Sequence, residues 1–200
     1  MEQNFESLRQ EIVDKSLEAF RQGLFSGTSG NMSCRVASDE MLITPTSVRY
    51  EALRAQDIVR MTLGGTVVEG ALQPSSEWRM HAAVYKAYPE TNAVFHTHSP
   101  YATAFAVVRR SIPAVLIEAR IFLGGDVRCA DYATPGTKEV GMNAVPALFE
   151  RGGCTLANHG VLAVGEDLAQ AYLRAEYIED VAKIYTYAKA IGEPVALDTL

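Results

Sequence analysis

The chain has 200 residues, which is enough for one domain with a buried core, and 48% of them are apolar and 21% charged, which excludes wholesale disorder. Its 18 basic and 24 acidic residues give a formal net charge of −6, opposite in sign to that of a typical nucleic-acid-binding protein. No stretch is apolar for long enough to predict a membrane-spanning helix. We therefore expect neither a nucleic acid nor a membrane as a partner.

The chain begins with MEQNFESLRQEIVDK, which is polar and acidic where a signal peptide carries an apolar stretch. Residues 4–22 place apolar side chains every three to five positions, which predicts an amphipathic helix ending at Gly23. Residues 27–31 form a loop of small residues. The Gly64-Gly65 pair predicts a hairpin turn between two β-type segments, around 57–62 and 66–69, which are the last two of four. The four segments lie around 31–36, 41–44, 57–62 and 66–69.

The second half of the chain alternates helices with short strands. Pro74-Ser75-Ser76 opens a helix that ends near Tyr88-Pro89, because the residue before proline avoids helical geometry. Residues 111–136 show no period and are predicted to be irregular. The remaining predictions are a strand over 92–98, a helix capped by Ser99-Pro100, a helix from Thr137 to Phe149 kinked by Pro146, strands over 154–157 and 161–164, and a helix from Asp167 to Gly192.

The long last helix is predicted to bury one face and to expose the other, which carries Glu176, Glu179 and Lys183. We find no repeat and no linker that divides the chain, so residues 1–200 are expected to form one α/β domain, with the order of strands in its sheet left open. The cysteines Cys34, Cys129 and Cys154 are widely spaced and form no Cys-x-x-Cys pair, which favours the reducing cytoplasm over a disulfide framework.

Two of the four histidines, His96 and His98, are two residues apart at the end of a predicted strand, so their side chains project from the same face. Together with His159, in a turn between two apolar strands, they have the spacing of a three-histidine metal site. An isolated His-x-His is also compatible with paired polar residues at a strand end.

Glu77 follows two serines at the start of a helix and is either a capping carboxylate or a further metal ligand that acts as a base. His81 lies one turn later on the face that carries Trp78, Ala82 and Tyr85. We therefore interpret His81 as a core histidine and not as a metal ligand.

A second cluster is typical of an anion site, because hydroxyl groups, glycine and helix N-termini all bring donors toward a phosphate. Each residue taken alone is also explained as a turn or capping residue. The members are Thr28, Gly30 and Asn31 in one loop, Thr46 and Ser47 in another, and Ser75 and Ser76 at a helix start.

Several segments, taken in order, resemble the class II aldolase/adducin family, most closely its L-fuculose-1-phosphate aldolase branch. The resemblance implies a three-layer α/β/α fold around a central, largely antiparallel sheet, and a homotetramer with active sites at subunit interfaces. The segments are GTSGNMSCR (27–35), LITPTSVRYEAL (42–53), PSSEWRMHAAVY (74–85), AVFHTHSPYATAFAV (93–107), DYATPGT (131–137) and LANHGVLAVGEDLAQAY (156–172).

The same resemblance implies a divalent metal, usually Zn²⁺ with Mn²⁺ or Co²⁺ as alternatives, on Glu77, His96, His98 and His159. It also implies that Thr28, Asn31, Ser75 and Ser76, helped by Gly30 and the turn at Thr46 and Ser47, hold the phosphate of a ketose 1-phosphate.

The implied reaction is a retro-aldol cleavage to dihydroxyacetone phosphate and an aldehyde, in which the metal stabilises the enediolate and Glu77 carries the proton. A Schiff-base lysine is the rival solution, but all five lysines lie on predicted helices outside these motifs. Alternatives on the same fold are a sugar-phosphate 4-epimerase, a decarboxylase or dehydratase, and a non-catalytic adducin-like assembly module.

The sequence departs from the branch at several positions. Where these aldolases carry a tyrosine acid, residues 112–120 read IPAVLIEAR, so Glu118 is the replacement we predict for the aldehyde-side proton, with a surface ion pair to Arg120 as the other interpretation. Ser47 occupies a position where these aldolases commonly have glycine. An apolar region with Ile117, Ile121 and Phe122 favours a 5-deoxy or methylthio pentulose phosphate.

Overall fold

Eight strands form one sheet in the order β4-β3-β2-β1-β5-β8-β7-β6 in the computed structural model, which describes residues 5–197. The six neighbouring pairs from β4 to β7 are antiparallel, and β6 runs parallel to β7. The strands are β1 (Asn31–Ala37), β2 (Glu40–Ile43), β3 (Val59–Thr62), β4 (Val67–Glu69), β5 (Ala93–Thr97), β6 (Arg128–Ala130), β7 (Gly153–Leu156) and β8 (Gly160–Gly165).

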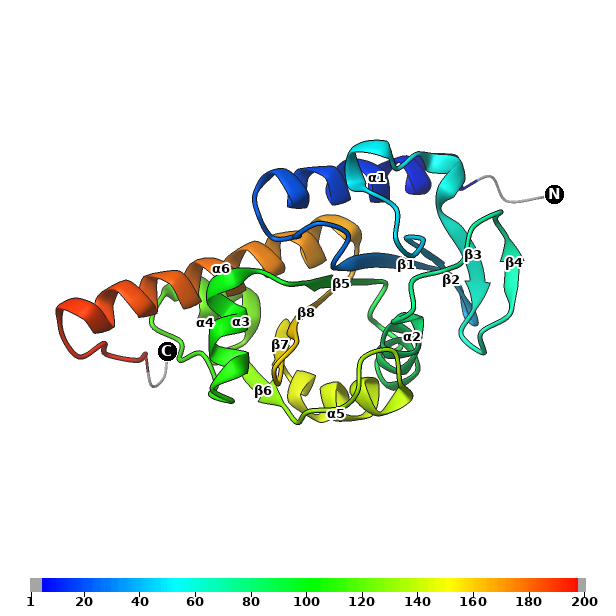
Figure 1. Ribbon diagram of the computed structural model, residues 1–200. Coiled ribbons are helices and arrows are strands. Elements are labelled where there is room, and N and C mark those ends of the chain that lie inside the picture. The colour runs from blue at the N-terminus through cyan, green and yellow to red at the C-terminus, as the bar shows by residue number, and fades with distance from the viewer. Residues whose placement is uncertain (1–4, 198–200) are drawn as a thin grey trace.

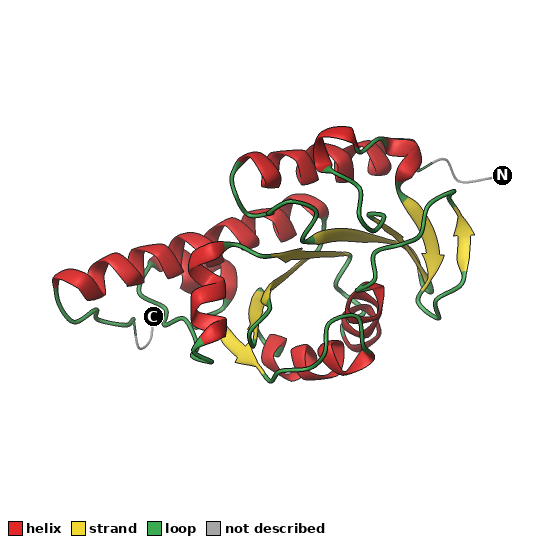
Figure 2. Cartoon of the chain, in the orientation of Figure 1, coloured by secondary structure: helices red, strands yellow, loops and turns green. Residues whose placement is uncertain are grey.

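Helices cover both faces of this sheet, with α1 and α6 on one side and α2 and α5 on the other (Figure 1). Figure 2 shows the two helical layers with the strands between them. The helices are α1 (Glu6–Arg21), α2 (Trp78–Ala87), α3 (Pro100–Val107), α4 (Ile117–Leu123), α5 (Lys138–Leu148) and α6 (Leu168–Ile191), with short 3₁₀ turns η1 (Tyr50–Ala52) and η2 (Ala55–Asp57). The predicted three-layer α/β/α fold with a largely antiparallel sheet is therefore confirmed.

The central strands supply a core to both layers because successive side chains of a strand point to opposite faces. On β5, Phe95 packs in the cluster under α1 and α6, whereas Val94 packs in the cluster under α2 and α5. On β8, Val161 and Leu162 divide in the same way. This alternation places His96, two residues after Val94, on the α2 side of the sheet.

Most predicted elements agree with the structure to within two residues. Strand β5 occupies Ala93–Thr97, and β3 and β4 form an antiparallel hairpin whose turn contains Gly65 with a positive φ of 102°. Residue 4, the first of the predicted N-terminal helix, lies outside the described residues. Within residues 5–197, no helix is both long enough and apolar enough to cross a membrane.

Two predictions are wrong. Residues 111–136 are not irregular throughout, because they contain α4 and β6, each too short to show a period in the sequence. The polar face of α6 is not simply solvated, since the Glu179 carboxylate accepts hydrogen bonds from the backbone N–H groups of Tyr101 at 2.9 Å and Ala102 at 2.8 Å. Glu179 thereby caps α3, whose N-cap residue Ser99 makes no side-chain capping bond.

Candidate active site

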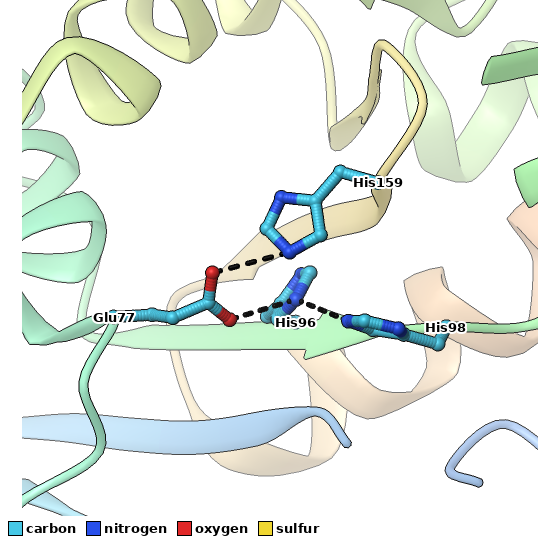
Figure 3. Close-up of side chains that lie close together, drawn as sticks. All are labelled: Glu77, His96, His98 and His159. Carbon is cyan, nitrogen blue, oxygen red and sulfur yellow. Dashed lines mark hydrogen bonds and ion pairs between the residues drawn. The ribbon is translucent and has the colours of Figure 1, made fainter. Parts of the chain in front are cut away.

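Four side chains from three separate parts of the chain meet at one end of the sheet (Figure 3). His96 is the last but one residue of β5, and His98 directly follows that strand. Glu77 is the N-cap residue of α2, and His159 lies in the turn between β7 and β8. That turn requires Gly160, because a Cβ there would collide with the carbonyl oxygen of Thr97. The strand end therefore fixes two ligands, and the close approach of the turn brings in the third imidazole.

The polar atoms of these side chains converge on a small volume. The Glu77 Oε2 lies 3.0 Å from His96 Nε2, and the Glu77 Oε1 lies 3.1 Å from His159 Nε2. The Nε2 atoms of His96 and His98 are 3.0 Å apart. One ligand atom from each of the four residues lies within 4.8 Å of all the others. The three imidazoles and the carboxylate predicted from the sequence are thus brought together.

The chemistry of the donors fits a cation. The ring Nδ1 of His96 lies 2.8 Å from the carbonyl oxygen of Val161, which only accepts, so Nδ1 carries the hydrogen in the neutral ring. Its Nε2 then presents a lone pair to the Glu77 carboxylate, which also only accepts. Two acceptors at this distance repel each other unless a positive ion or a proton lies between them. Lone pairs that face one another across a short gap are typical of the ligands of a metal ion.

Electrostatics keep the cluster in its metal-binding protonation states. Burial alone would raise the pKa of Glu77, but its close contacts with His96 and His159 outweigh burial and lower it. Burial and repulsion from His96 and His159 lower the pKa of His98 to about 4. A carboxylate and a neutral imidazole at neutral pH are both ready ligands.

A cavity of about 310 Å³ opens beside the cluster. Glu77, His98 and His159 line it on the metal side, and His96 is fully buried. All seven residues predicted for the anion site also line it, together with Ser29, Pro45 and Pro135, which sequence reasoning did not select. The seven are Thr28, Gly30, Asn31, Thr46, Ser47, Ser75 and Ser76.

Asn31 connects the two predicted clusters. It stands opposite His96 in the β1–β5 ladder, and its side-chain nitrogen donates to the Glu77 Oε2 at 3.1 Å. Gly30 precedes it with φ of 89°, and a Cβ there would collide with the Phe25 ring, so the loop depends on glycine at this position.

The sequence matches the family described as the class II aldolase and adducin N-terminal domain over residues 10–186. The chain belongs to this family.

Relatives and solved structures of the class II aldolase and adducin family match nearly the whole chain. An L-fuculose phosphate aldolase of Escherichia coli (strain K12) is 42% identical, covering 98% of this chain and 89% of its own. A 5-deoxy-D-ribulose 1-phosphate aldolase of Bacillus thuringiensis is 39% identical, covering 94% and 89%. A solved L-fuculose 1-phosphate aldolase superposes with a TM-score of 0.91 at 40% identity, covering 96% and 90%.

One predicted site residue, Glu118, does not lie at the cavity. Glu118 lies in the first turn of α4, which packs on α6, and it does not line the cavity. Its expected alternative partner, Arg120, donates to the carbonyl oxygen of Leu197 at 2.7 Å. The proton-transfer role of Glu118 therefore stays a prediction.

The apolar residues invoked for substrate choice also lie on α4. Ile117, Ile121 and Phe122 are 42%, 64% and 36% exposed, and they are not among the residues that line the cavity beside the metal cluster. His81, interpreted as a core histidine, is fully buried as expected. Burial and repulsion from His96 lower its pKa to about 3, so its ring is neutral.

Proposed function

We propose that the protein is a metal-dependent aldolase that cleaves a small ketose 1-phosphate to dihydroxyacetone phosphate and an aldehyde. The observation that carries this proposal is the position of Glu77, whose carboxylate lies in the four-residue cluster and also lines the hydroxyl-rich cavity. A group in this position reaches both a bound cation and a substrate whose phosphate lies among the hydroxyls.

The residues divide into two roles. Thr28, Asn31, Ser75 and Ser76 offer hydroxyl and amide donors that bind and orient the phosphate, with Gly30 and the 46–47 turn completing the wall. Glu77 holds and returns the proton at the carbon next to the carbonyl. A divalent cation held by Glu77, His96, His98 and His159, for which we propose Zn²⁺, supplies positive charge to the oxygens that become negative as the carbon–carbon bond breaks.

The identity of the sugar is the finer part of the proposal. The two named relatives act on a fuculose phosphate and on a 5-deoxyribulose 1-phosphate and have similar identities to this chain. We propose that the substrate is of one of these two types, including the methylthio analogue of the pentulose.

The test is a substrate panel with zinc-loaded protein whose metal content is measured by elemental analysis. L-Fuculose 1-phosphate, 5-deoxyribulose 1-phosphate and 5-methylthioribulose 1-phosphate are each assayed for release of dihydroxyacetone phosphate. We expect release that requires the metal, with the free aldehyde recovered by trapping. Turnover that rearranges the sugar without a trappable aldehyde would indicate a 4-epimerase, and absence of turnover would contradict the proposal.

We also propose that the protein works in the cytoplasm as a homotetramer. Cys34, Cys129 and Cys154 are free thiols in the structure, which is compatible with a reducing compartment. Exposed apolar side chains on α4 and on the distal part of α6 support an interface between copies of the chain.

A further inference from the structure

A row of buried polar side chains runs from Glu77 into the layer between β1 and α2. Asn31 and Ser33 project from β1 toward His81 and Tyr85, which lie one turn apart on α2. The His81 Nε2 is 2.5 Å from Asn31 Oδ1, the His81 Nδ1 is 2.7 Å from Ser33 Oγ, and Ser33 Oγ is 2.8 Å from the Tyr85 hydroxyl. None of these four residues is more than 4% exposed, so their buried polar atoms depend on one another for hydrogen bonds.

The carboxylate at one end fixes the direction of every hydrogen bond in the row. A carboxylate only accepts, so the Asn31 nitrogen faces Glu77 and the Asn31 oxygen faces His81. The His81 Nε2 therefore carries the ring hydrogen and donates it. Its Nδ1 is then an acceptor for the Ser33 hydroxyl, and Ser33 Oγ in turn accepts from Tyr85.

The same logic shows what His81 does for the site. If the Asn31 amide turned over while His81 kept its hydrogen on Nε2, the amide oxygen would face the Glu77 carboxylate and the amide nitrogen would face the His81 N–H. Like groups would then be opposed at both ends. The imidazole thus disfavours the wrong orientation of an amide that both contacts Glu77 and lines the cavity. A ring that merely filled the core would not impose this choice.

We propose that His81 is a positioning residue: its Nε2–H holds the Asn31 amide with its nitrogen directed at Glu77, and so fixes the carboxylate for metal binding and proton transfer. The catalytic part of this inference rests on the proposed function, whereas the hydrogen-bond pattern does not. Polar groups that orient a metal-ligating carboxylate typically alter metal affinity by about 10- to 100-fold when they are removed.

The first experiment identifies the tautomer of His81 by NMR in protein labelled with ¹⁵N-histidine, both metal-free and zinc-loaded. The His81 signals are assigned by their loss in His81→Gln. We expect a neutral ring protonated at Nε2, with a slowly exchanging Nε2 proton. A ring protonated at Nδ1, or at both nitrogens, at neutral pH would overturn the proposal without any activity measurement.

The second experiment measures zinc affinity by competition with a chromophoric chelator in two variants and a control. His81→Phe keeps a buried ring but removes the donor, and we expect it to lose about 10- to 100-fold in zinc affinity. His81→Gln retains an N–H donor and is expected to recover most of that loss. Met80→Ala, the neighbouring core residue of α2, lowers Tm through a cavity and is expected to keep the affinity of the wild type.

Wild-type zinc affinity in His81→Phe, or equal losses in the Phe and Gln variants, would contradict a positioning role. These outcomes are separate from failure of the proposed function. A protein that turns over none of the ketose 1-phosphates refutes the aldolase proposal, while the tautomer and zinc measurements still decide the role of His81.

Discussion

At the scale of single residues, Glu77 has one carboxylate and three polar neighbours, since it contacts His96, His159 and Asn31. Glu77→Gln keeps its shape and removes its charge and its ability to take up a proton. We expect kcat to fall by about 10²- to 10⁴-fold, the usual contribution of a general base. The assay is run at saturating zinc with bound metal measured, so that loss of the ion is distinguished from loss of proton transfer. Near-normal turnover in the metal-loaded variant would contradict the role.

Ser47 is a second informative residue, because its φ of 61° lies in the left-handed region that favours glycine. Its hydroxyl belongs to the cavity wall and lies 3.5 Å from that of Thr46. Because strained backbone positions cluster at functional sites, we infer that the Ser47 hydroxyl contacts the substrate phosphate.

We therefore expect Ser47→Gly to raise KM for the ketose 1-phosphate by about tenfold, as for a lost hydrogen bond to a charged group, with kcat little changed. Steady-state kinetics measure both constants. The matched control is Ser38→Gly in the exposed turn between β1 and β2, which should leave KM unaltered. An unchanged KM in Ser47→Gly would show that the hydroxyl does not bind substrate.

At the scale of secondary-structure elements, α3 depends on α6 for its N-terminal cap. Pro100 occupies the first helical turn, and the next two backbone N–H groups donate to Glu179. Glu179→Ala leaves these donors without their acceptor, so we expect a loss of about 1 kcal/mol in the free energy of unfolding. Glu179→Gln retains an acceptor oxygen and should lose less.

Urea denaturation measures the free energy of unfolding of both variants. The control is Asp180→Ala, at an exposed position of the same helix, whose free energy of unfolding should stay within about 0.5 kcal/mol of wild type.

The same contact shows why sequence patterns predict some features and not others. Strands such as β5 and β8 are predictable because each contains a short apolar run, 93–95 and 161–164, that is bounded by polar or small residues. The seven residues of α4 and the three of β6 are too short for a period to emerge. The role of Glu179 depends on a helix 78 residues earlier in the chain, a distance at which helical periodicity carries no information.

The candidate site was predictable to the extent that residue types and local spacing encode it. His96 and His98 are a strand pair, and Glu77 with Ser75 and Ser76 marks a helix start, so each cluster has a local signature. The link through Asn31 and His81 has none, because it depends on strand register and on which face of α2 meets β1. Glu118 is predicted as a proton carrier only because it stands near the position where the resembling aldolases carry a tyrosine. The structure places it on α4, and it does not line the cavity.

At the scale of the whole molecule, the distal part of α6 projects beyond the sheet (Figure 1), with apolar side chains open to solvent. Ile184, Tyr187 and Ile191 share one side of the helix and are 38%, 51% and 91% exposed. Packing against another copy of the chain would remove this surface from water, and we propose that it forms part of the interface of the homotetramer.

We expect Ile184→Asp combined with Ile191→Asp to dissociate the assembly, because burying two added carboxylates without partners opposes association. Sedimentation velocity measures the mass, and kinetics on the separated species show whether turnover falls with it, as sites at subunit interfaces require. Lys189→Glu is the control, since at 100° per residue it lies on the opposite side of α6 and introduces acidic charge there. A double variant that keeps the wild-type mass would exclude this surface from the interface, and a wild-type chain that sediments as a monomer would refute the tetramer itself.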